Sequence, residues 1–297
     1  MHTPLGFCTP LKGKRLDCMI KLIATDMDGT FLDGEGSFDR QRFAAILAQL
    51  AERKIPFVIA SGNGIERLRQ LCEGFEEDLI FVADNGTHIY QGGETRLRRG
   101  LTQQESGMVL SYFKGQWATI CLMLGNDHHI YMQEGAGVPF EGTGLPIKPE
   151  QMKAFQDRVV QLEDLAAYPT DQPIFKAGFW VPEEQVDELV GGFNRQYAGQ
   201  LMAVTSGYGS VDILPAGIHK AWGLEQVLQD LGIQAEQVMA FGDSDNDLEL
   251  LAYAGHSYAM ENATDKVKAV AKYRAPSHLE AGVMQVLENW LSETKGE

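Results

Sequence analysis

The sequence has few cysteines, no long apolar run and a deficit of positive charge. Its four cysteines, Cys8, Cys18, Cys72 and Cys121, are scattered without a CxxC pair, which indicates reduced thiols and a cytoplasmic location. No apolar run approaches the roughly 20 residues that span a bilayer, and the chain start lacks the apolar stretch of a signal peptide. These absences argue against a disulfide-stabilised secreted protein and against a membrane protein.

The charge of the chain restricts its partners. The sequence contains 25 Lys and Arg against 41 Asp and Glu, a formal net charge of −16. Such a charge argues against nucleic acid or an anionic membrane as a partner. An anionic substrate would be repelled overall, so its site would need local lysines or a metal ion.

The remaining composition is that of a globular protein large enough for two domains. Of the 297 residues, 44% are hydrophobic and 22% are charged. Short apolar runs alternate with amphipathic stretches, which is typical of an α/β protein with a parallel sheet. We expect buried strands at residues 19–25, 57–61, 79–83, 237–241 and 256–260.

The middle of the chain differs in texture, and we interpret it as a second α/β domain inserted into the first. The full division is an N-terminal extension without order at 1–18, a core at 19–87 and 214–297, and an inserted domain at 88–213. Within the insertion we expect strands in 117–123, 173–180 and 201–205, helices around 150–165 and 182–198, and a loop at 134–146.

Acidic residues end the first expected strand. Asp26 and Asp28 follow the apolar run of residues 19–25, and Gly29 permits a sharp backbone turn directly after them. In open parallel α/β sheets, ligands bind at the carboxyl ends of the strands. An acid at such a position can simply cap a loop. The two acids therefore indicate a functional site only if the ends of other strands carry complementary groups.

Complementary groups follow other strands of the same sheet. The stretch Ser61-Gly62-Asn63 supplies a hydroxyl and free backbone amides, and GDSDND at 242–247 supplies further acids. Lys220 stands just before an expected helix. The side chains expected at this edge are Asp26, Asp28, Ser61, Lys220, Asp243, Asp245, Asn246 and Asp247.

This set of oxygen ligands favours one kind of metal ion. Several carboxylates at one place repel each other unless a cation lies among them. Oxygen donors suit Mg²⁺, which often shares a substrate phosphate, and Lys220 and Ser61 would then contact phosphate oxygens. His128 and His129 are adjacent and the cysteines are scattered, so a zinc site is not expected.

Four motifs in this order resemble the haloacid dehalogenase-like phosphatases: DMDGT at 26–30, SG at 61–62, Lys220, and GDSDND at 242–247. ADNGTHIY at 83–90, followed by a long insertion, is similar to the Cof-type branch. FVIASGN, TSGYGSVDILPAGIHKA and GDSDNDLELL are most similar to its sugar-phosphatase group, and the resemblance spans residues 19–291. It implies a Rossmann-like, doubly wound parallel-sheet core with a large inserted α/β cap of the C2B type.

The resemblance also implies roles for the acids. Asp26 would be the nucleophile that forms an aspartyl-phosphate, and Asp28 would be the general acid and base. Mg²⁺ would be held by the Asp26 carboxylate, the Asp28 backbone carbonyl and Asp243, with Asp247 close to them.

Phosphate binding is assigned in the same way. Ser61, Gly62, Lys220 and Asn246 would hold the phosphoryl group in line and offset its charge. Many relatives have Arg where Asn63 stands, although the sugar-phosphatase group often does not. This departure favours that group.

Substrate specificity should lie in the inserted cap, which closes over the site and excludes water. Lys176, on an expected strand, is the first candidate for a substrate contact, and Trp180 and Tyr208 are the others. For each of the three, packing or a surface position is the alternative that residue type alone favours.

The expected function is Mg²⁺-dependent hydrolysis of small phosphorylated metabolites, with sugar phosphates as the favoured substrates. Flavin, pyridoxal or nucleotide phosphates are alternatives, and a phosphomutase on the same scaffold is less favoured. A dehalogenase would not need Asp28, and a phosphonatase would have a small cap. A phospho-accepting signalling domain, typically about 100–150 residues, has no cap. A catalytically inactive binding protein would not keep every motif acid.

Overall fold

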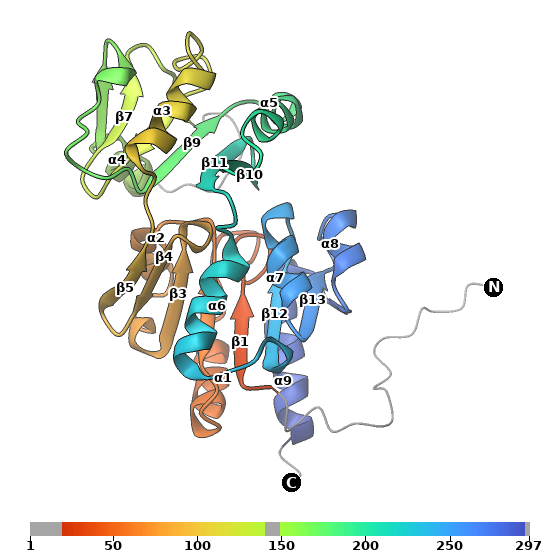
Figure 1. Ribbon diagram of the computed structural model, residues 1–297. Helices are drawn as coiled ribbons and strands as arrows, with labels where there is room; N and C mark the ends of the chain where they lie inside the picture. Colours follow the sequence, from red (N-terminus) through yellow and green to blue (C-terminus); the bar gives the residue numbers. More distant parts are fainter. Residues whose placement is uncertain (1–19, 140–148, 295–297) are drawn as a thin grey trace.

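The computed structural model describes residues 20–139 and 149–294, which form two bodies, each built on its own sheet (Figure 1). The larger sheet has eight strands in the order β14-β13-β12-β1-β2-β3-β4-β5. Its strands are β1 (Leu22–Thr25), β2 (Phe57–Ala60), β3 (Leu79–Ala83), β4 (His88–Gln91), β5 (Glu94–Arg98), β12 (Val238–Gly242), β13 (His256–Met260) and β14 (Tyr273–Ala275). The expected N-terminal extension lies outside the described residues, as does most of the expected loop at 134–146.

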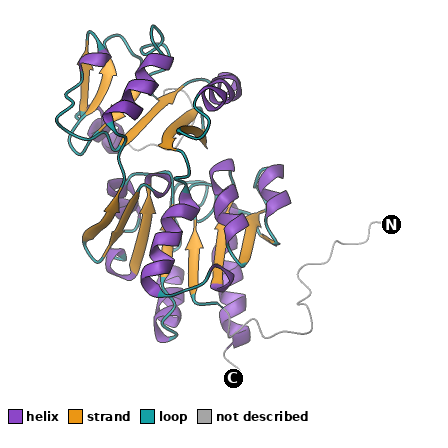
Figure 2. Cartoon of the chain, viewed as in Figure 1, coloured by secondary structure: helices purple, strands orange, loops and turns teal. Residues whose placement is uncertain are grey.

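The five strands expected from apolar runs all occur in the larger sheet, where they pair in parallel. Helices cover both faces of this sheet (Figure 2), as expected for strands that are apolar throughout. The helices of this body are α1 (Arg40–Glu52), α2 (Ile65–Leu71), α6 (Lys220–Leu231), α7 (Leu248–Tyr253), α8 (Asp265–Val270) and α9 (Gly282–Glu293). Within the described ranges, no helix is both long and apolar enough to cross a membrane.

The larger sheet extends further along the chain than the sequence indicated. Strand β4 pairs antiparallel with β3, and β5 pairs with β4, so His88–Arg98 completes the edge of this sheet. The predicted start of the insertion at residue 88 therefore falls inside the larger sheet. The apolar pattern marks a strand but does not show which sheet the strand joins.

The second body, which we call the insert (residues 101–215), has a six-stranded sheet in the order β10-β11-β9-β6-β7-β8. Its hydrophobic core is separate from that of the larger body, and Phe113, Phe179 and Phe193 pack together within it. The elements are α3 (Gln103–Tyr112), β6 (Met123–Gly125), β7 (Ile130–Gln133), α4 (Pro149–Gln156), β8 (Val159–Leu162), β9 (Lys176–Trp180), α5 (Glu183–Gln196), β10 (Leu201–Gly207) and β11 (Ser210–Pro215).

Two expectations for the insert were wrong in part. The strand expected in 117–123 begins only at Met123, because hydrogen bonds such as Ile120 N–H to Gln116 O fold the preceding residues into turns. The helix expected around 150–165 ends at Gln156, because Val159–Leu162 pairs in parallel with β7 as β8. The expected helix around 182–198 is confirmed as α5.

The insert lies beyond the carboxyl end of β1, on the side to which the β1 arrow points in Figure 1. The chain leaves the larger sheet after Arg98 and returns to it through α6, which begins at Lys220. Two short connections therefore join the insert to the core.

A pair of deletions tests where the insert begins. Replacing residues 101–215 with a short Gly/Ser linker should leave the eight-stranded sheet intact and give a soluble core that unfolds cooperatively. Replacing residues 88–212 should remove β4 and β5 and expose the edge of the apolar strand β3, which invites aggregation. Size-exclusion chromatography and thermal unfolding compare the two, and equal behaviour would contradict the boundary drawn from the sheet.

Candidate active site

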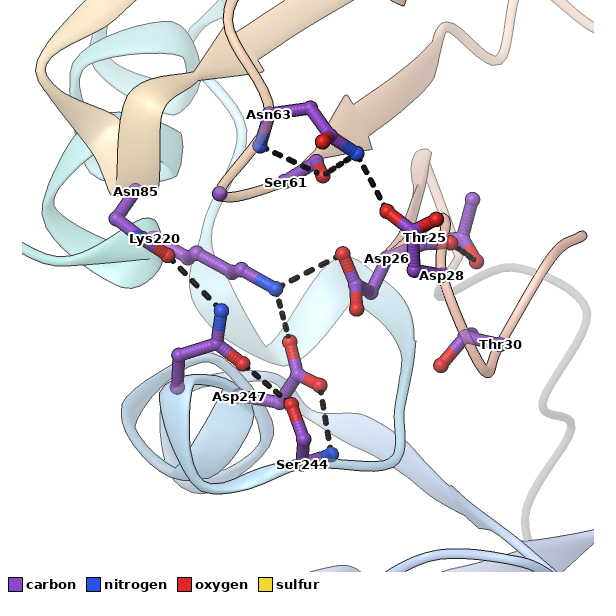
Figure 3. A network of polar contacts seen from close by, with 12 residues as sticks. Thr25, Asp26, Asp28, Thr30, Ser61, Asn63, Asn85, Lys220, Ser244 and Asp247 are labelled. Carbon is purple, nitrogen blue, oxygen red and sulfur yellow. Dashed lines mark hydrogen bonds and ion pairs between the residues drawn. The ribbon is translucent and has the colours of Figure 1, made fainter. Parts of the chain in front are cut away.

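A buried lysine lies between two aspartates at the centre of the candidate site (Figure 3). The Lys220 side chain is 0% exposed, and its Nζ lies 2.9 Å from Asp26 Oδ1 and 2.7 Å from Asp247 Oδ1. Asp26 follows β1 and its backbone N–H donates to the Phe241 carbonyl of β12. The three charges thus come from three separate segments that meet at the carboxyl end of the sheet.

Close backbone packing places Lys220. It is the first residue of α6, whose N-terminus is capped by the His219 side chain accepting from the Trp222 N–H. A Cβ at Gly223 in this helix would lie 2.8 Å from Gly86 Cα, so α6 can approach the turn after β3 only because Gly223 has no side chain. Lys220 therefore enters the site on a helix packed directly against the core.

The loop after β12 is ordered by Asp247. Its Oδ2 accepts hydrogen bonds from the backbone N–H groups of Asp243 at 2.9 Å and Ser244 at 3.1 Å, while its Oδ1 pairs with Lys220. Asp243 accepts a 2.6 Å hydrogen bond from the Thr30 hydroxyl. Gly29 has φ +73°, and a Cβ there would lie 2.5 Å from Asp243 Oδ2. The glycine after the two acids thus makes room for a third.

Negative charge is in excess here. Carboxylate oxygens of Asp26, Asp243 and Asp247 all lie within 4.8 Å of one another. Burial raises the pKa of Asp26 well above its ordinary value; Lys220 lowers it, but Asp247 and Asp243 raise it further. Burial and Asp247 raise the pKa of Asp243 to about 7, against the lowering effect of the Thr30 hydroxyl. This set of crowded, hard oxygen donors fits a divalent cation.

Asp28 lies apart from the buried acids. Its side chain is 43% exposed; Asn63 Nδ2 donates to its Oδ2 at 2.5 Å and the Arg67 guanidinium lies 3.2 Å from its Oδ1. Arg67, on α2, was not found from the sequence. It lies four residues after Asn63, so this segment supplies both an amide and a guanidinium to Asp28.

Two of the candidate phosphate-binding residues, Ser61 and Lys220, lie close to Asp26. Ser61 is buried, and its Oγ accepts from the Asn63 backbone N–H at 3.2 Å. Figure 3 shows Ser61, Asp26, Lys220 and Asp247 converging from four segments of the chain. Asn246 is 8% exposed and donates from Nδ2 to Asn85 Oδ1 at 3.0 Å.

Of the three candidates in the insert, Lys176 reaches the core. Its Nζ donates to the Gly62 carbonyl at 2.9 Å and lies 3.3 Å from both Asp84 and Asp212. Burial lowers the pKa of Lys176, but the carboxylates of Asp212 and Asp84 outweigh this effect and raise it.

The other two candidates contact each other. The Trp180 indole N–H donates to the Tyr208 carbonyl at 2.9 Å, and Tyr208 is 48% exposed in the turn between β10 and β11. A substrate role for either residue stays a prediction.

The polar residues that follow β3 lie in the motif ADNGTHIY, but the motif alone did not indicate a role for them in the site. Asp84 and Asn85 end this strand as Asp26 ends β1, and the Asn-Gly pair is itself a turn signal. The same rule that identified the other strand ends could have found them. Asp212 and Ser244 were missed as well, and Asp212 carries no local signal because it lies within β11.

Removal of the buried ammonium should destabilise the protein. Lys220→Met leaves Asp26 and Asp247 without their counter-charge, which should lower the free energy of unfolding by about 3–5 kcal/mol at neutral pH. Without Lys220 the Asp26 pKa rises further, so the folded state binds protons that the unfolded chain has released. The deficit should therefore be smaller at about pH 5 than at about pH 8.

Urea unfolding at both pH values measures the loss of unfolding free energy in Lys220→Met. Lys266→Met is the matched control, since Lys266 pairs with Asp245 while 72% exposed and should contribute less than about 1 kcal/mol. Equal losses in the two variants would contradict the central position given to Lys220.

Comparison with known proteins places this geometry in a family. Residues 23–287 match a family model described as haloacid dehalogenase-like hydrolase. The chain is 31% identical over 274 residues to a 5-amino-6-(5-phospho-D-ribitylamino)uracil phosphatase of Escherichia coli (strain K12), covering 92% of this chain and 96% of that protein. It is 26% identical over 275 residues to an HMP-PP phosphatase of Serratia proteamaculans (strain 568), with the same coverage of 92% and 96%.

A solved structure agrees with these matches. A crystal structure of a Streptococcus mutans UA159 protein superposes with a TM-score of 0.80 at 32% identity, covering 92% of this chain and 99% of that one. The family model spans both the larger sheet and the insert, and the resemblance seen in the four motifs is confirmed. This chain belongs to the haloacid dehalogenase-like hydrolases.

Proposed function

We propose that this protein is a phosphatase of small phosphorylated metabolites that works through an aspartyl-phosphate intermediate at Asp26. The observation that carries the proposal is the Lys220 ammonium, buried beside Asp26 at the carboxyl end of the sheet. Two relatives named as phosphatases, each matched over 92% of this chain, support the same reaction class.

The proposed reaction has two steps. A carboxylate oxygen of Asp26 attacks phosphorus, the bond between phosphorus and the ester oxygen breaks, and the departing alcohol takes a proton from Asp28. Water then attacks phosphorus, Asp28 accepts its proton, and the acyl-phosphate bond breaks to release phosphate and restore Asp26. The partial exposure of Asp28 suits a group that exchanges protons with both alcohol and water.

Positive and hydrogen-bonding groups would hold the phosphoryl group. We assign this role to Lys220, the Ser61 hydroxyl, the Gly62 backbone and the Asn246 amide. Lys220 and Ser61 approach Asp26 from separate segments, Gly62 follows Ser61, and Asn246 precedes Asp247. Groups that are already in place stabilise developing charge without having to reorganise.

We further propose Mg²⁺ as the cofactor. The Asp26 carboxylate, the Asp28 backbone carbonyl and Asp243 would hold it, with Asp247 beside them. Burial and, after it, the neighbouring Asp247 raise the pKa of Asp243, and a cation would offset the repulsion between the two acids. When bound, Mg²⁺ supplies positive charge that offsets the carboxylates and the phosphoryl oxygens.

For the substrate we favour a sugar phosphate. Phosphorylated 5-amino-6-ribitylaminouracil is a second candidate, since the Escherichia coli relative at 31% identity is named for it. Both carry their phosphate on a hydroxylated carbon chain. The Lys176 side chain of the insert is 43% exposed and its Nζ is bonded to the Gly62 carbonyl, so we propose that it contacts such a chain.

Phosphate release from a panel of esters tests the proposed function. Hexose, pentose and tetrose phosphates, the ribitylaminouracil phosphate, and flavin, pyridoxal and nucleotide phosphates should be compared with and without Mg²⁺. We expect release from sugar or ribityl phosphates that stops on chelation and is absent in the nearly isosteric Asp26→Asn variant. Turnover by that variant would contradict the mechanism, and phosphate transfer to a second sugar without release would indicate a mutase.

The leaving group should reveal the role of Asp28. In Asp28→Asn, turnover of a sugar phosphate should fall by about 10²–10⁴-fold, because the alkoxide leaves without a proton donor. Turnover of p-nitrophenyl phosphate, whose leaving group needs no proton, should fall much less. Steady-state kcat/KM for both esters measures the difference, and equal losses would show that Asp28 acts in some other way.

A further inference from the structure

A buried line of hydrogen bonds joins the insert to the loop that carries Asn246. The Asn85 side-chain amide donates from Nδ2 to Asp212 Oδ2 at 2.8 Å, and its Oδ1 accepts from Asn246 Nδ2 at 3.0 Å. The Ser244 hydroxyl donates to Asn246 Oδ1 at 2.6 Å. Asp212, Asn85 and Asn246 are 4%, 1% and 8% exposed, so water does not compete for these contacts.

The direction of this line is set at the Asp212 end. An ionised carboxylate can only accept hydrogen bonds, so the Asn85 group that faces Asp212 must be its NH₂. The carbonyl oxygen of Asn85 then faces Asn246, so Asn246 must donate a hydrogen bond to it from its own NH₂ group. The carboxylate of the insert is thereby consistent with Nδ2 of Asn246, and not Oδ1, meeting Asn85.

The backbone of Asn85 is fixed by its neighbours, so the side chain cannot easily shift its position. Its backbone N–H donates to the Ser61 carbonyl at 3.0 Å, and its φ of +54° lies in the left-handed region that Asn tolerates better than most residues. The next residue, Gly86, packs against the His219 carbonyl so closely that a Cβ would not fit. The side chain therefore extends from a backbone turn fixed to both the Ser61 loop and the start of α6.

We propose that Asn85 is a positioning residue: with Asp212 of the insert, it orients the Asn246 amide so that the second N–H of Asn246 is presented to a phosphoryl oxygen. The inference rests on the phosphate-binding role proposed above for Asn246. If Asn85 has this role, phosphate affinity depends on the position of the insert. Displacement of β11 would remove Asp212 from Asn85, and the amides of Asn85 and Asn246 could then rotate.

The proposal is tested by the inhibition constant of inorganic phosphate, measured with p-nitrophenyl phosphate as the reporter substrate at saturating Mg²⁺. Because inorganic phosphate has no leaving group, this constant reports contacts to the phosphoryl oxygens alone. Asn246→Ala should raise this constant roughly tenfold, the usual effect of losing a hydrogen bond to a charged group. Asn85→Gly, which keeps the left-handed backbone, and Asp212→Ala should each raise it several-fold.

Two further measurements separate positioning from a general loss of structure. In the Asn246→Ala background, Asn85→Gly and Asp212→Ala should cause no additional rise, because their effect passes through the amide that is already missing. Asn194→Ala is the control within the insert: Asn194 bonds both backbone groups of Ala203 on β10. That variant should lower the unfolding midpoint and leave the phosphate inhibition constant unchanged.

The outcomes distinguish this inference from the function on which it rests. If Asn246→Ala raises the inhibition constant but Asn85→Gly and Asp212→Ala do not, or if their effects add to that of Asn246→Ala, the positioning role is overturned. If Asn246→Ala itself changes nothing, the phosphate-binding assignment of Asn246 fails, and the positioning role fails with it.

Discussion

The Lys220 ammonium, buried between Asp26 and Asp247, is the constraint on which the rest of the structure depends. A charge taken fully out of water is costly unless it is paired and its hydrogen bonds are met, and Lys220 meets both conditions at 2.9 and 2.7 Å. To do so, the ends of β1 and β12 and the start of α6 must converge within a few ångströms. The pairing of β1 with β12 brings two of these segments together, and the glycine contact between Gly223 and Gly86 admits the third.

The turn after β3 connects this charged centre to the insert. Its backbone contacts the Ser61 loop and α6, while Asp84 and Asn85 contact Lys176 and Asp212 of the insert. The insert therefore contacts the same turn that packs against α6, the helix that carries Lys220. Through the Asn85 side chain, the turn also links Asp212 of the insert to Asn246.

Charge distribution resolves the conflict between an acidic chain and an anionic substrate. The formal net charge is −16, yet the groups around Ser61 and Asp28 include Lys220, Lys176 and Arg67. Each cation is paired with aspartate, and the acids Asp26, Asp243 and Asp247 still lie within 4.8 Å of one another. The proposed divalent cation would supply the positive charge that the lysines do not, and in this proposal the phosphate site and the metal site share Asp26.

The sequence by itself determined the features that depend on local order along the chain. Asp26, Ser61 and Asp243 could be placed at one edge because each follows an apolar strand, and parallel strands end on the same side of a sheet. Only the tertiary structure decided what depends on pairing between distant segments: that His88–Arg98 joins the larger sheet, that Arg67 approaches Asp28, and that Asp212 meets Asn85 across 127 residues. The spacing of apolar residues indicates which face of a helix or strand is buried. It carries no information about which polar residue from a distant segment will contact that element.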